Sequence, residues 1–269
     1  MTFPDVRLTR RPLHFIYLCD CSGSMQANGK IQSLNQAIRQ SLPAMVKVSE
    51  DNPEAAILVR VVSFSDQARW HIGEPTPVGA MQRAWVDLQA GGLTAMGQAL
   101  QLVGAALRTP PMEQRALPPV LVLISDGAPT DDFKGALRSL MREPWARKAV
   151  RLAIAIGHDA DLEELQRFIE LDPEAADGNP GGGPGGDRMP GGGLGGDRLP
   201  GQKGARRPLQ ANNANALASY IQWASTVVIG AVSQPLSEAG ERRTDTNVPL
   251  PDLPPTELDP NMIDPNEPW

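Results

Sequence analysis

The chain has 269 residues, of which 41% are apolar, 21% charged and 4% aromatic, and its net charge at pH 7 is −6. This length fits one large domain or two small ones, and the apolar fraction supports a hydrophobic core, which excludes global disorder. The sequence has no basic block typical of nucleic-acid or anionic-lipid binding, no apolar run of membrane-spanning length, and no apolar signal segment in residues 1–11.

The negative charge is concentrated towards the end of the chain. Of the 31 acidic and 25 basic residues, residues 233–269 hold eight and two, which leaves 23 of each in the remainder. The only cysteines, Cys19 and Cys21, stand two apart, where a disulfide rarely forms and where zinc would find too few ligands. We therefore expect a reduced, cytoplasmic protein.

Unbroken apolar runs alternate with apolar residues at helical spacing along the chain. In chain order, they predict a strand over 13–19, a helix over 30–48, a strand over 57–64, a short edge strand over 68–72, a helix over 96–107, a strand over 120–124, a helix from 133, a strand over 150–156, a short helix around 161–170 and a helix around 217–228. This order predicts an α/β domain with a doubly wound, mostly parallel central sheet, helices on both faces and one short antiparallel edge strand.

Two segments depart from this pattern. Residues 177–208 contain two decamers, PGGGPGGDRM (180–189) and PGGGLGGDRL (190–199), which match at eight of ten positions and predict a flexible insertion. Residues 233–269 are rich in proline and acid, which predicts an extended tail. The predicted organisation is therefore an N-terminal arm (1–11), a domain over 12–232 that contains the insertion, and the acidic tail.

Oxygen-bearing side chains follow the strands at the edge where such sheets bind ligands. The first strand ends in Asp20-Cys21-Ser22-Gly23-Ser24, a D-x-S-x-S sequence. Thr94 precedes a predicted helix, and Asp126 follows the strand over 120–124. Hard cations such as Mg²⁺ take oxygen ligands in near-octahedral geometry, so these five side chains predict a divalent-metal site.

This pattern resembles the metal-ion-dependent adhesion site (MIDAS) of von Willebrand factor A (VWA) domains. That motif combines D-x-S-x-S with a distant Thr in a T-x-x-G setting, here Thr94 with Gly97, and a distant Asp before Gly, here Asp126 with Gly127. The resemblance looks closer still to bacterial TerY-like proteins, the tellurium-resistance-associated VWA group. The stretches that carry it are RRPLHFIYLCDCSGSM, GGLTAMGQAL, VLVLISDGAPTDD and NNANALASYIQWAS.

The resemblance implies a VWA-type fold and roles for the site residues. Ser22, Ser24 and Thr94 would bind the metal directly, while Asp20 and Asp126 would act directly or through water. The metal would be Mg²⁺, or alternatively Mn²⁺ or Ca²⁺. Two carboxylates and three neutral hydroxyls would leave the cation electropositive, with one position open for an acidic side chain of a protein partner.

The resemblance also implies a function and partners. It implies a non-enzymatic, metal-dependent protein-interaction module in bacterial signalling, stress or metalloid-resistance systems, with a Ser/Thr protein kinase and a PPM-type phosphatase as partners. An alternative within this family is an adaptor for a MoxR-type AAA+ ATPase. An enzymatic alternative is Mg²⁺-dependent phosphotransfer with Asp20 as nucleophile, but Ser22 stands where such enzymes use a second Asp as general acid.

Three further interpretations concern the helix caps, the histidines and the tail. Asp131 and Asp132 are expected to cap the helix that begins near Phe133. The three histidines show no metal-ligand spacing. Two interpretations of the tail stay open. It is either a solvated spacer or an extended acidic segment that docks on a partner through Leu253, Leu258 and Trp269.

Overall fold

Strands and helices alternate along the chain in the computed structural model, which describes residues 10–158, 160–171 and 207–233. In chain order the elements are β1 (Arg11–Asp20), η1 (Gly23–Gly29, a 3-10 helix), α1 (Lys30–Asp51), β2 (Ala55–Phe64), β3 (Ala68–Pro77), α2 (Val78–Ala84), α3 (Met96–Ala106), β4 (Val120–Ser125), α4 (Phe133–Leu140), α5 (Pro144–Lys148), β5 (Val150–Ile156), α6 (Leu162–Glu170), β6 (Leu209–Ala211), α8 (Ala214–Trp223), η2 (Ala224–Val228, a π-helical turn) and α9 (Ile229–Ser233).

The strands form one six-stranded sheet in the order β3-β2-β1-β4-β5-β6. The pairing is parallel except between β2 and β3, which pair antiparallel at one edge. Residues of β1 and β4 are almost all buried, as expected for central strands covered on both faces. The predicted fold class is therefore confirmed.

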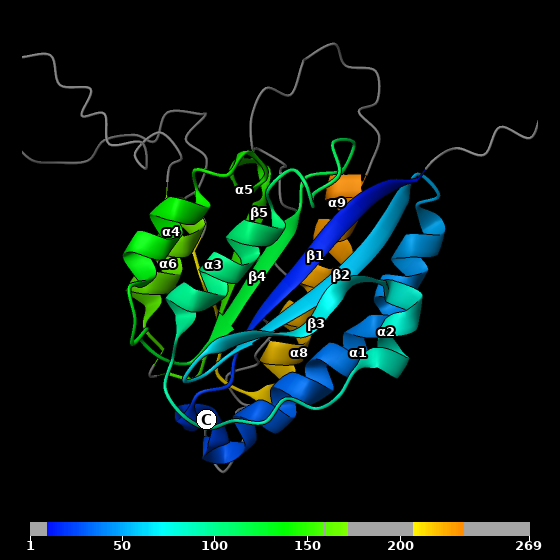
Figure 1. The fold of residues 1–269 in the computed structure, drawn as a ribbon. Helices are drawn as coiled ribbons and strands as arrows, with labels where there is room; N and C mark the ends of the chain where they lie inside the picture. Colours follow the sequence, from blue (N-terminus) through cyan, green and yellow to red (C-terminus); the bar gives the residue numbers. More distant parts are fainter. Residues whose placement is uncertain (1–9, 159, 172–206, 234–269) are drawn as a thin grey trace, which may run out of the picture.

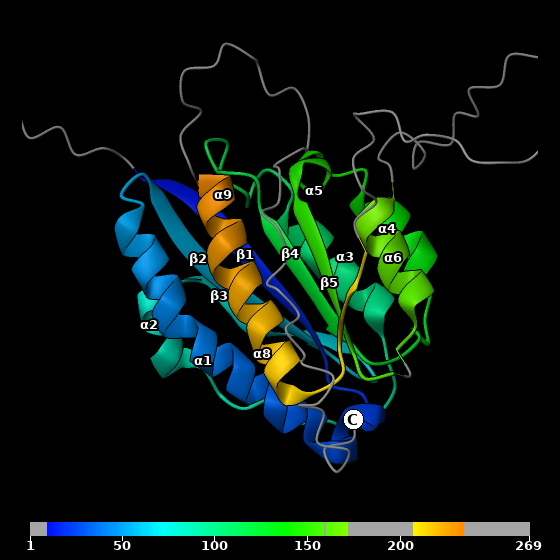
Figure 2. The same cartoon turned by 180° about the vertical axis from the view of Figure 1, so that it is seen from behind.

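Helices cover the sheet in two layers. α3, α4, α5 and α6 pack on one face, and α1, α2, α8 and α9 pack on the other (Figures 1 and 2). Alternate residues of β1 divide between the two layers, with Tyr17 in the cluster under α1 and α8 and Leu18 in the cluster under α3. Because the central strands run parallel, their carboxyl ends meet at one edge of the sheet, beside η1 at the bottom of Figure 1.

The structure contains several elements that the sequence pattern did not predict. α2 and α5 have seven and five residues, and β6 has three. β3 is also longer than the predicted edge strand and extends through Gly73 and Pro75 to Pro77. Such short or interrupted segments carry too few periodic positions to be recognised from apolar spacing alone.

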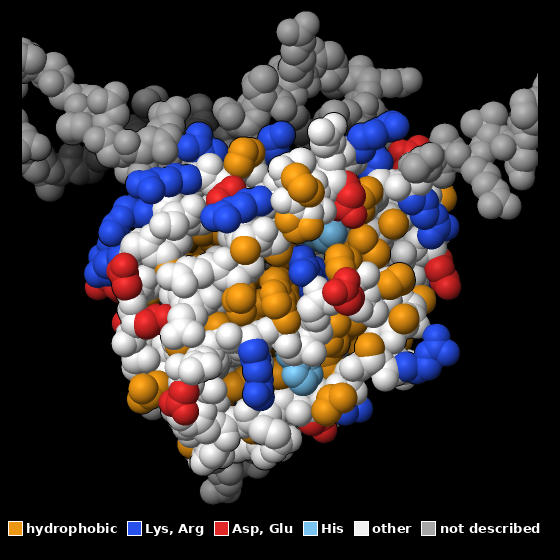
Figure 3. All heavy atoms as spheres, in the orientation of Figure 1, with side chains coloured by type: hydrophobic (Ala, Val, Ile, Leu, Met, Phe, Trp, Pro, Cys, Tyr) orange, Lys and Arg blue, Asp and Glu red, His pale blue; other side chains and the backbone are white. Residues whose placement is uncertain are grey.

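One part of the sheet is only half covered by helices. In the first half of β2, Ile57 and Val59 are buried, whereas Leu58 and Arg60 on the opposite face are half-buried. The Arg60 guanidinium lies over the Trp70 ring of β3, 4.1 Å from its centroid. Figure 3 shows apolar side chains over the strands on this face, beside α3.

Some predictions lie outside the described residues. These are most of the N-terminal arm, nearly all of the insertion over 177–208, and the acidic tail from residue 234 on. The predicted domain boundaries thus stay predictions. Within the ranges that the structure describes, no helix has both the length and the apolarity needed to cross a membrane.

Candidate metal centre

The five predicted donors lie on three loops at one edge of the sheet. Asp20 ends β1, Asp126 follows β4, and Thr94 precedes α3. β1 and β4 are paired neighbours, with Cys19 aligned on Ile124, so their carboxyl ends are adjacent. This edge is where parallel sheets of this kind place ligands, because the loops that leave neighbouring strands converge there.

The turn after β1 is fixed by hydrogen bonds from its own residues and from the Thr94 loop. The Ser22 backbone N–H donates to Asp20 Oδ1 over 2.8 Å, a local bond that favours a tight turn. Gly23 N–H donates to the Gly92 carbonyl over 2.9 Å, and Gly91 N–H donates to the Cys21 carbonyl over 2.8 Å. The D-x-S-x-S turn and the loop before Thr94 are therefore held together through their backbones.

Three of the donors form one hydrogen-bonded cluster of oxygens, and the fourth, Thr94, lies on the adjoining loop. Ser22 Oγ and Ser24 Oγ are 2.9 Å apart, and Ser24 Oγ donates to Asp126 Oδ1 over 2.7 Å. A Cβ atom built on Gly127, the residue after Asp126, would lie 4.0 Å from both Ser24 Oγ and Thr94 Oγ1, so both hydroxyls face the backbone of this loop. Residues from three separate segments thus meet, as their placement at strand ends predicts.

The spacing of these oxygens suits a small hard cation. In an octahedron with metal–oxygen distances of about 2.0–2.1 Å, neighbouring ligands are about 2.9 Å apart. The observed separations of 2.9 Å (Ser22 to Ser24) and 2.7 Å (Ser24 to Asp126) are close to this value. No group of three or more His, Cys, Asp or Glu that could hold a metal occurs among the described residues, so the centre depends on hydroxyl oxygens.

Asp20 has a different position from the other donors, because both of its oxygens are already engaged. Oδ1 accepts from Ser22 N–H, and Oδ2 accepts from the Ser125 hydroxyl over 2.5 Å. Burial raises the pKa of Asp20 to about 6, although these hydrogen bonds lower it, and the negative charge of Asp126 raises it further. Asp20 therefore suits a role that holds the loop and reaches a metal through water.

A buried lysine, which the sequence pattern did not predict, places a positive charge beside Asp126. Lys30 begins α1, and its Nζ lies 2.7 Å from Asp126 Oδ2. The lysine side chain is 7% exposed and the aspartate side chain is not exposed. A lysine six residues after the motif carries no periodic or spacing signal, so only the structure reveals this pair.

The two adjacent aspartates, Asp131 and Asp132, cap two different helices. Asp132 caps α4, as predicted, and accepts from Gly135 N–H over 2.9 Å. The prediction for Asp131 was wrong, because its carboxylate accepts from Gly97 N–H and Gln98 N–H at the start of α3, over 2.8 and 2.9 Å. A Cβ on Gly97 would lie 2.9 Å from the Asp132 carbonyl, so only glycine allows this close approach. Asp131 thus ties the loop after β4 to the helix that follows Thr94.

The two cysteines do not contribute to the centre. Both are buried and free, as the sequence predicts. Burial raises the pKa of Cys21 to about 12, and it raises that of Cys19 well above the ordinary value. Both thiols therefore stay protonated at neutral pH and lack the thiolate form that binds metals.

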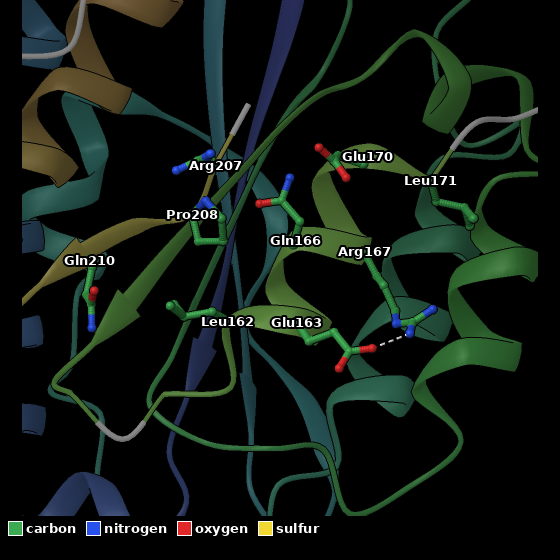
Figure 4. A pocket seen from close by; sticks show the side chains of 9 residues that line it. All are labelled: Leu162, Glu163, Gln166, Arg167, Glu170, Leu171, Arg207, Pro208 and Gln210. Carbon is green, nitrogen blue, oxygen red and sulfur yellow. Dashed lines mark hydrogen bonds and ion pairs between the residues drawn. The ribbon is translucent and has the colours of Figure 1, made fainter. Parts of the chain in front are cut away.

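A separate groove of about 920 Å³ lies between α6 and the β6 edge of the sheet (Figure 4). Its lining residues are Leu162, Glu163, Gln166, Arg167, Glu170, Leu171, Arg207, Pro208 and Gln210. None of the five candidate donors lines it, and two of its charged residues, Glu163 and Arg167, form an ion pair with each other. The groove is therefore not part of the candidate centre.

Comparison with known proteins supports the same fold. Residues 15–128 match the family model of the von Willebrand factor type A domain. Among solved structures, the chain is similar to a von Willebrand factor type A protein from Catenulispora acidiphila, with 18% identity and a TM-score of 0.53 over 82% of this chain and 43% of that one.

Two further structures are similar to this chain. One is proximal thread matrix protein 1 from the mussel byssus with a zinc-occupied MIDAS motif (14% identity, TM-score 0.54, over 82% of this chain and 48% of that one). The other is the D319A mutant of the PilB minor pilin from Streptococcus sanguinis (12%, 0.50, over 85% and 64%). The chain spans less than half the length of the first two structures. At these identities the likeness shows the fold, and no curated protein matches the chain.

Proposed function

Because the family match and the fold support a VWA domain, we propose that this chain is a non-enzymatic module that binds another protein through a divalent cation. The observation that carries the proposal is the contact between the Ser22, Ser24 and Asp126 oxygens, with the Thr94 loop bonded to the same turn through its backbone. The two carboxylates carry two negative charges, and one of them is paired with Lys30. A divalent ion and Lys30 together carry three positive charges, so the centre would keep an excess of positive charge. A bound Mg²⁺, or Mn²⁺ or Ca²⁺ in its place, would supply an electropositive centre for an acidic side chain of the partner.

The described residues around the cluster leave it accessible from one side. Gly23 and Ser24 are exposed, and Leu93, next to Thr94, is 59% exposed. The Leu93 backbone N–H donates to Asp66 Oδ1 over 2.9 Å, which fixes the loop while its apolar side chain faces solvent. An acidic residue with an apolar neighbour is the partner chemistry that this edge favours.

Calorimetric titration with MgCl₂ or MnCl₂ tests the metal part of the proposal. The wild type should bind one divalent ion. Thr94→Val, which keeps the shape and removes the hydroxyl, and Asp20→Ala should both bind at least about tenfold more weakly. Thr76→Val on β3 provides the matched control and should bind like the wild type. Equal binding by all four proteins would contradict the proposal.

The resemblance to TerY-like proteins suggests a Ser/Thr protein kinase and a PPM-type phosphatase as partners, in a stress or metalloid-resistance system. A MoxR-type AAA+ ATPase is the alternative. A cytoplasmic location is part of this proposal, because Cys19 and Cys21 are unpaired thiols. Affinity capture from native cells with Mg²⁺ or with EDTA, followed by mass spectrometry, distinguishes the partners, and the proposal requires that the captured protein be lost with EDTA.

Phosphotransfer through Asp20 is disfavoured by the engagement of its carboxylate. Both oxygens accept hydrogen bonds inside the protein, and Asp20 is fully buried. The later acidic pair that such an enzyme would use for Mg²⁺, Asp131 and Asp132, instead caps two helices. An assay with a generic aryl phosphate should give no Asp20-dependent hydrolysis.

A further inference from the structure

Lys30 is buried against the candidate metal centre rather than exposed on its helix. Lysine is rarely buried without a partner, and here the partner is Asp126, 2.7 Å away. The two oxygens of Asp126 have different neighbours, because Oδ1 accepts from Ser24 Oγ and Oδ2 accepts from Lys30 Nζ. The carboxylate that would serve a divalent cation is therefore shared with an internal cation.

The surrounding backbone holds the lysine tip in this place. Gly157 follows β5 with a positive φ of 81°, and a Cβ atom on it would lie 3.4 Å from both Cε and Nζ of Lys30. Gly157 N–H donates to the Ala211 carbonyl of β6 over 2.8 Å, which anchors this backbone to the sheet. The lysine side chain thus spans from the start of α1 to the ends of β4 and β5.

The positive charge of Lys30 would repel a divalent cation bound at Asp126. With Asp20 and Asp126 ionised, the cluster carries two negative charges and the single positive charge of Lys30. A divalent cation that uses Asp126 comes close to an ammonium group that water screens only weakly, and like charges in such surroundings repel strongly. The lysine and the divalent cation therefore compete for one carboxylate.

We propose that Lys30 is a built-in competitor of the divalent cation, which holds Asp126 in the metal-free protein and raises the cation concentration at which the centre fills. The inference rests on the proposed metal binding and concerns its regulation by one residue. Lys30 is a positioning residue in this scheme, since it acts on the metal through Asp126. A purely structural lysine would also neutralise Asp126, but its loss would not strengthen metal binding.

Titration of the full chain with MgCl₂ separates these two roles. Lys30→Gln keeps a hydrogen-bond donor and removes the charge, so it should bind Mg²⁺ at least about tenfold more tightly than the wild type. Its metal-free form should melt at a lower temperature, and Mg²⁺ should raise its melting temperature further than it raises that of the wild type. Lys30→Arg, which keeps the charge, and Lys47→Gln, a change at an exposed lysine on the same helix, should bind like the wild type.

The Mg²⁺ affinities of the wild type and of Lys30→Gln distinguish a failure of the lysine competition from a failure of the proposed function. If the wild type binds Mg²⁺ and Lys30→Gln binds equally or more weakly, the competition is overturned while the metal-dependent function stands. If no variant binds Mg²⁺, Mn²⁺ or Ca²⁺, the proposed function fails as well. If Lys30→Gln does not fold, NMR of the wild type provides the test. The ¹⁵Nζ signal of Lys30, assigned by its absence from Lys30→Arg, should shift when Mg²⁺ is added. A signal that does not move overturns the inference.

Discussion

Asp20 is subject to two opposing influences at the end of β1. Burial disfavours its charge, while Ser22 N–H and the Ser125 hydroxyl stabilise that charge. Burial prevails, because the pKa of Asp20 is raised from 3.8 to about 6. The metal-free protein therefore carries a carboxylate whose ionisation opposes folding, and this charge is what a cation nearby would relieve.

The pH dependence of stability should reflect this raised pKa. Between about pH 4 and pH 6 the folded state keeps a proton on Asp20 that the unfolded state has lost. The free energy of unfolding should thus fall by roughly 3 kcal/mol as the pH rises through this window, and Asp20→Asn should lack this contribution. Urea denaturation in EDTA at several pH values measures the difference. Asp51→Asn, at an exposed position of α1, is the control, and parallel curves for Asp20→Asn and wild type would refute the expectation.

Leu93 should contribute to partner binding without affecting the metal. It is 59% exposed beside Thr94, and burial of such a side chain in an interface contributes about 1–2 kcal/mol. Leu93→Ser should therefore weaken capture of an acidic partner by about 5- to 30-fold and leave the Mg²⁺ affinity unchanged. Val86→Ser, at another exposed apolar residue (68%) after α2, is the matched control. Equal effects of the two substitutions would argue against a contact at Leu93.

At the scale of elements, α3 is held in place by a loop from another part of the sheet. The Asp131 carboxylate accepts from the Gly97 and Gln98 N–H groups in the first turn of α3, where a negative charge also suits the helix dipole. Thr130 N–H donates to the Thr94 carbonyl over 2.9 Å, which adds a backbone link between the same two segments. The Thr94 hydroxyl is therefore positioned through the loop that carries Asp126.

Substitution of the two adjacent aspartates should separate stability from metal affinity. Asp131→Ala and Asp132→Ala each remove a helix cap and should each lower the free energy of unfolding by about 1–2 kcal/mol. Only Asp131→Ala should also weaken Mg²⁺ binding, because it frees the helix that follows Thr94. Chemical denaturation and calorimetry on both variants measure the two effects. A similar loss of Mg²⁺ affinity in Asp132→Ala would contradict this division.

The sequence allowed the long elements to be predicted, and it placed the five candidate donors on loops at one edge of the sheet, because both depend on local signals; their role as metal ligands stays a prediction. Apolar runs and helical spacing indicate β4 and α1, and the ends of the paired strands β1 and β4 indicate that Asp20 and Asp126 lie at the same edge of the sheet. Lys30 and Asp131 could not be placed in this way. Their partners are 96 and 34 residues away in the chain, and nothing in the spacing identifies them.

At the scale of the whole molecule, the candidate centre joins segments that follow β1 and β4 with the segment that precedes α3. A ligand that binds only the folded state stabilises it by an amount that grows with its concentration, about 2.7 kcal/mol at 100 times the dissociation constant. MgCl₂ at one concentration should therefore raise the melting temperature of the wild type further than that of Thr94→Val. Thermal denaturation at matched ionic strength measures this effect, and an equal rise in both proteins would show that Mg²⁺ acts elsewhere.

The groove beside α6 has a practical consequence for engineering. Leu171 and Arg207, the described residues on either side of 172–206, line opposite sides of this one groove (Figure 4). The free energy needed to close a loop between two such points depends only weakly on the length of the loop, since each doubling costs about 0.6 kcal/mol. A fluorescent protein could thus be inserted between these two residues, at the β6 side of the sheet, to report on the protein in cells.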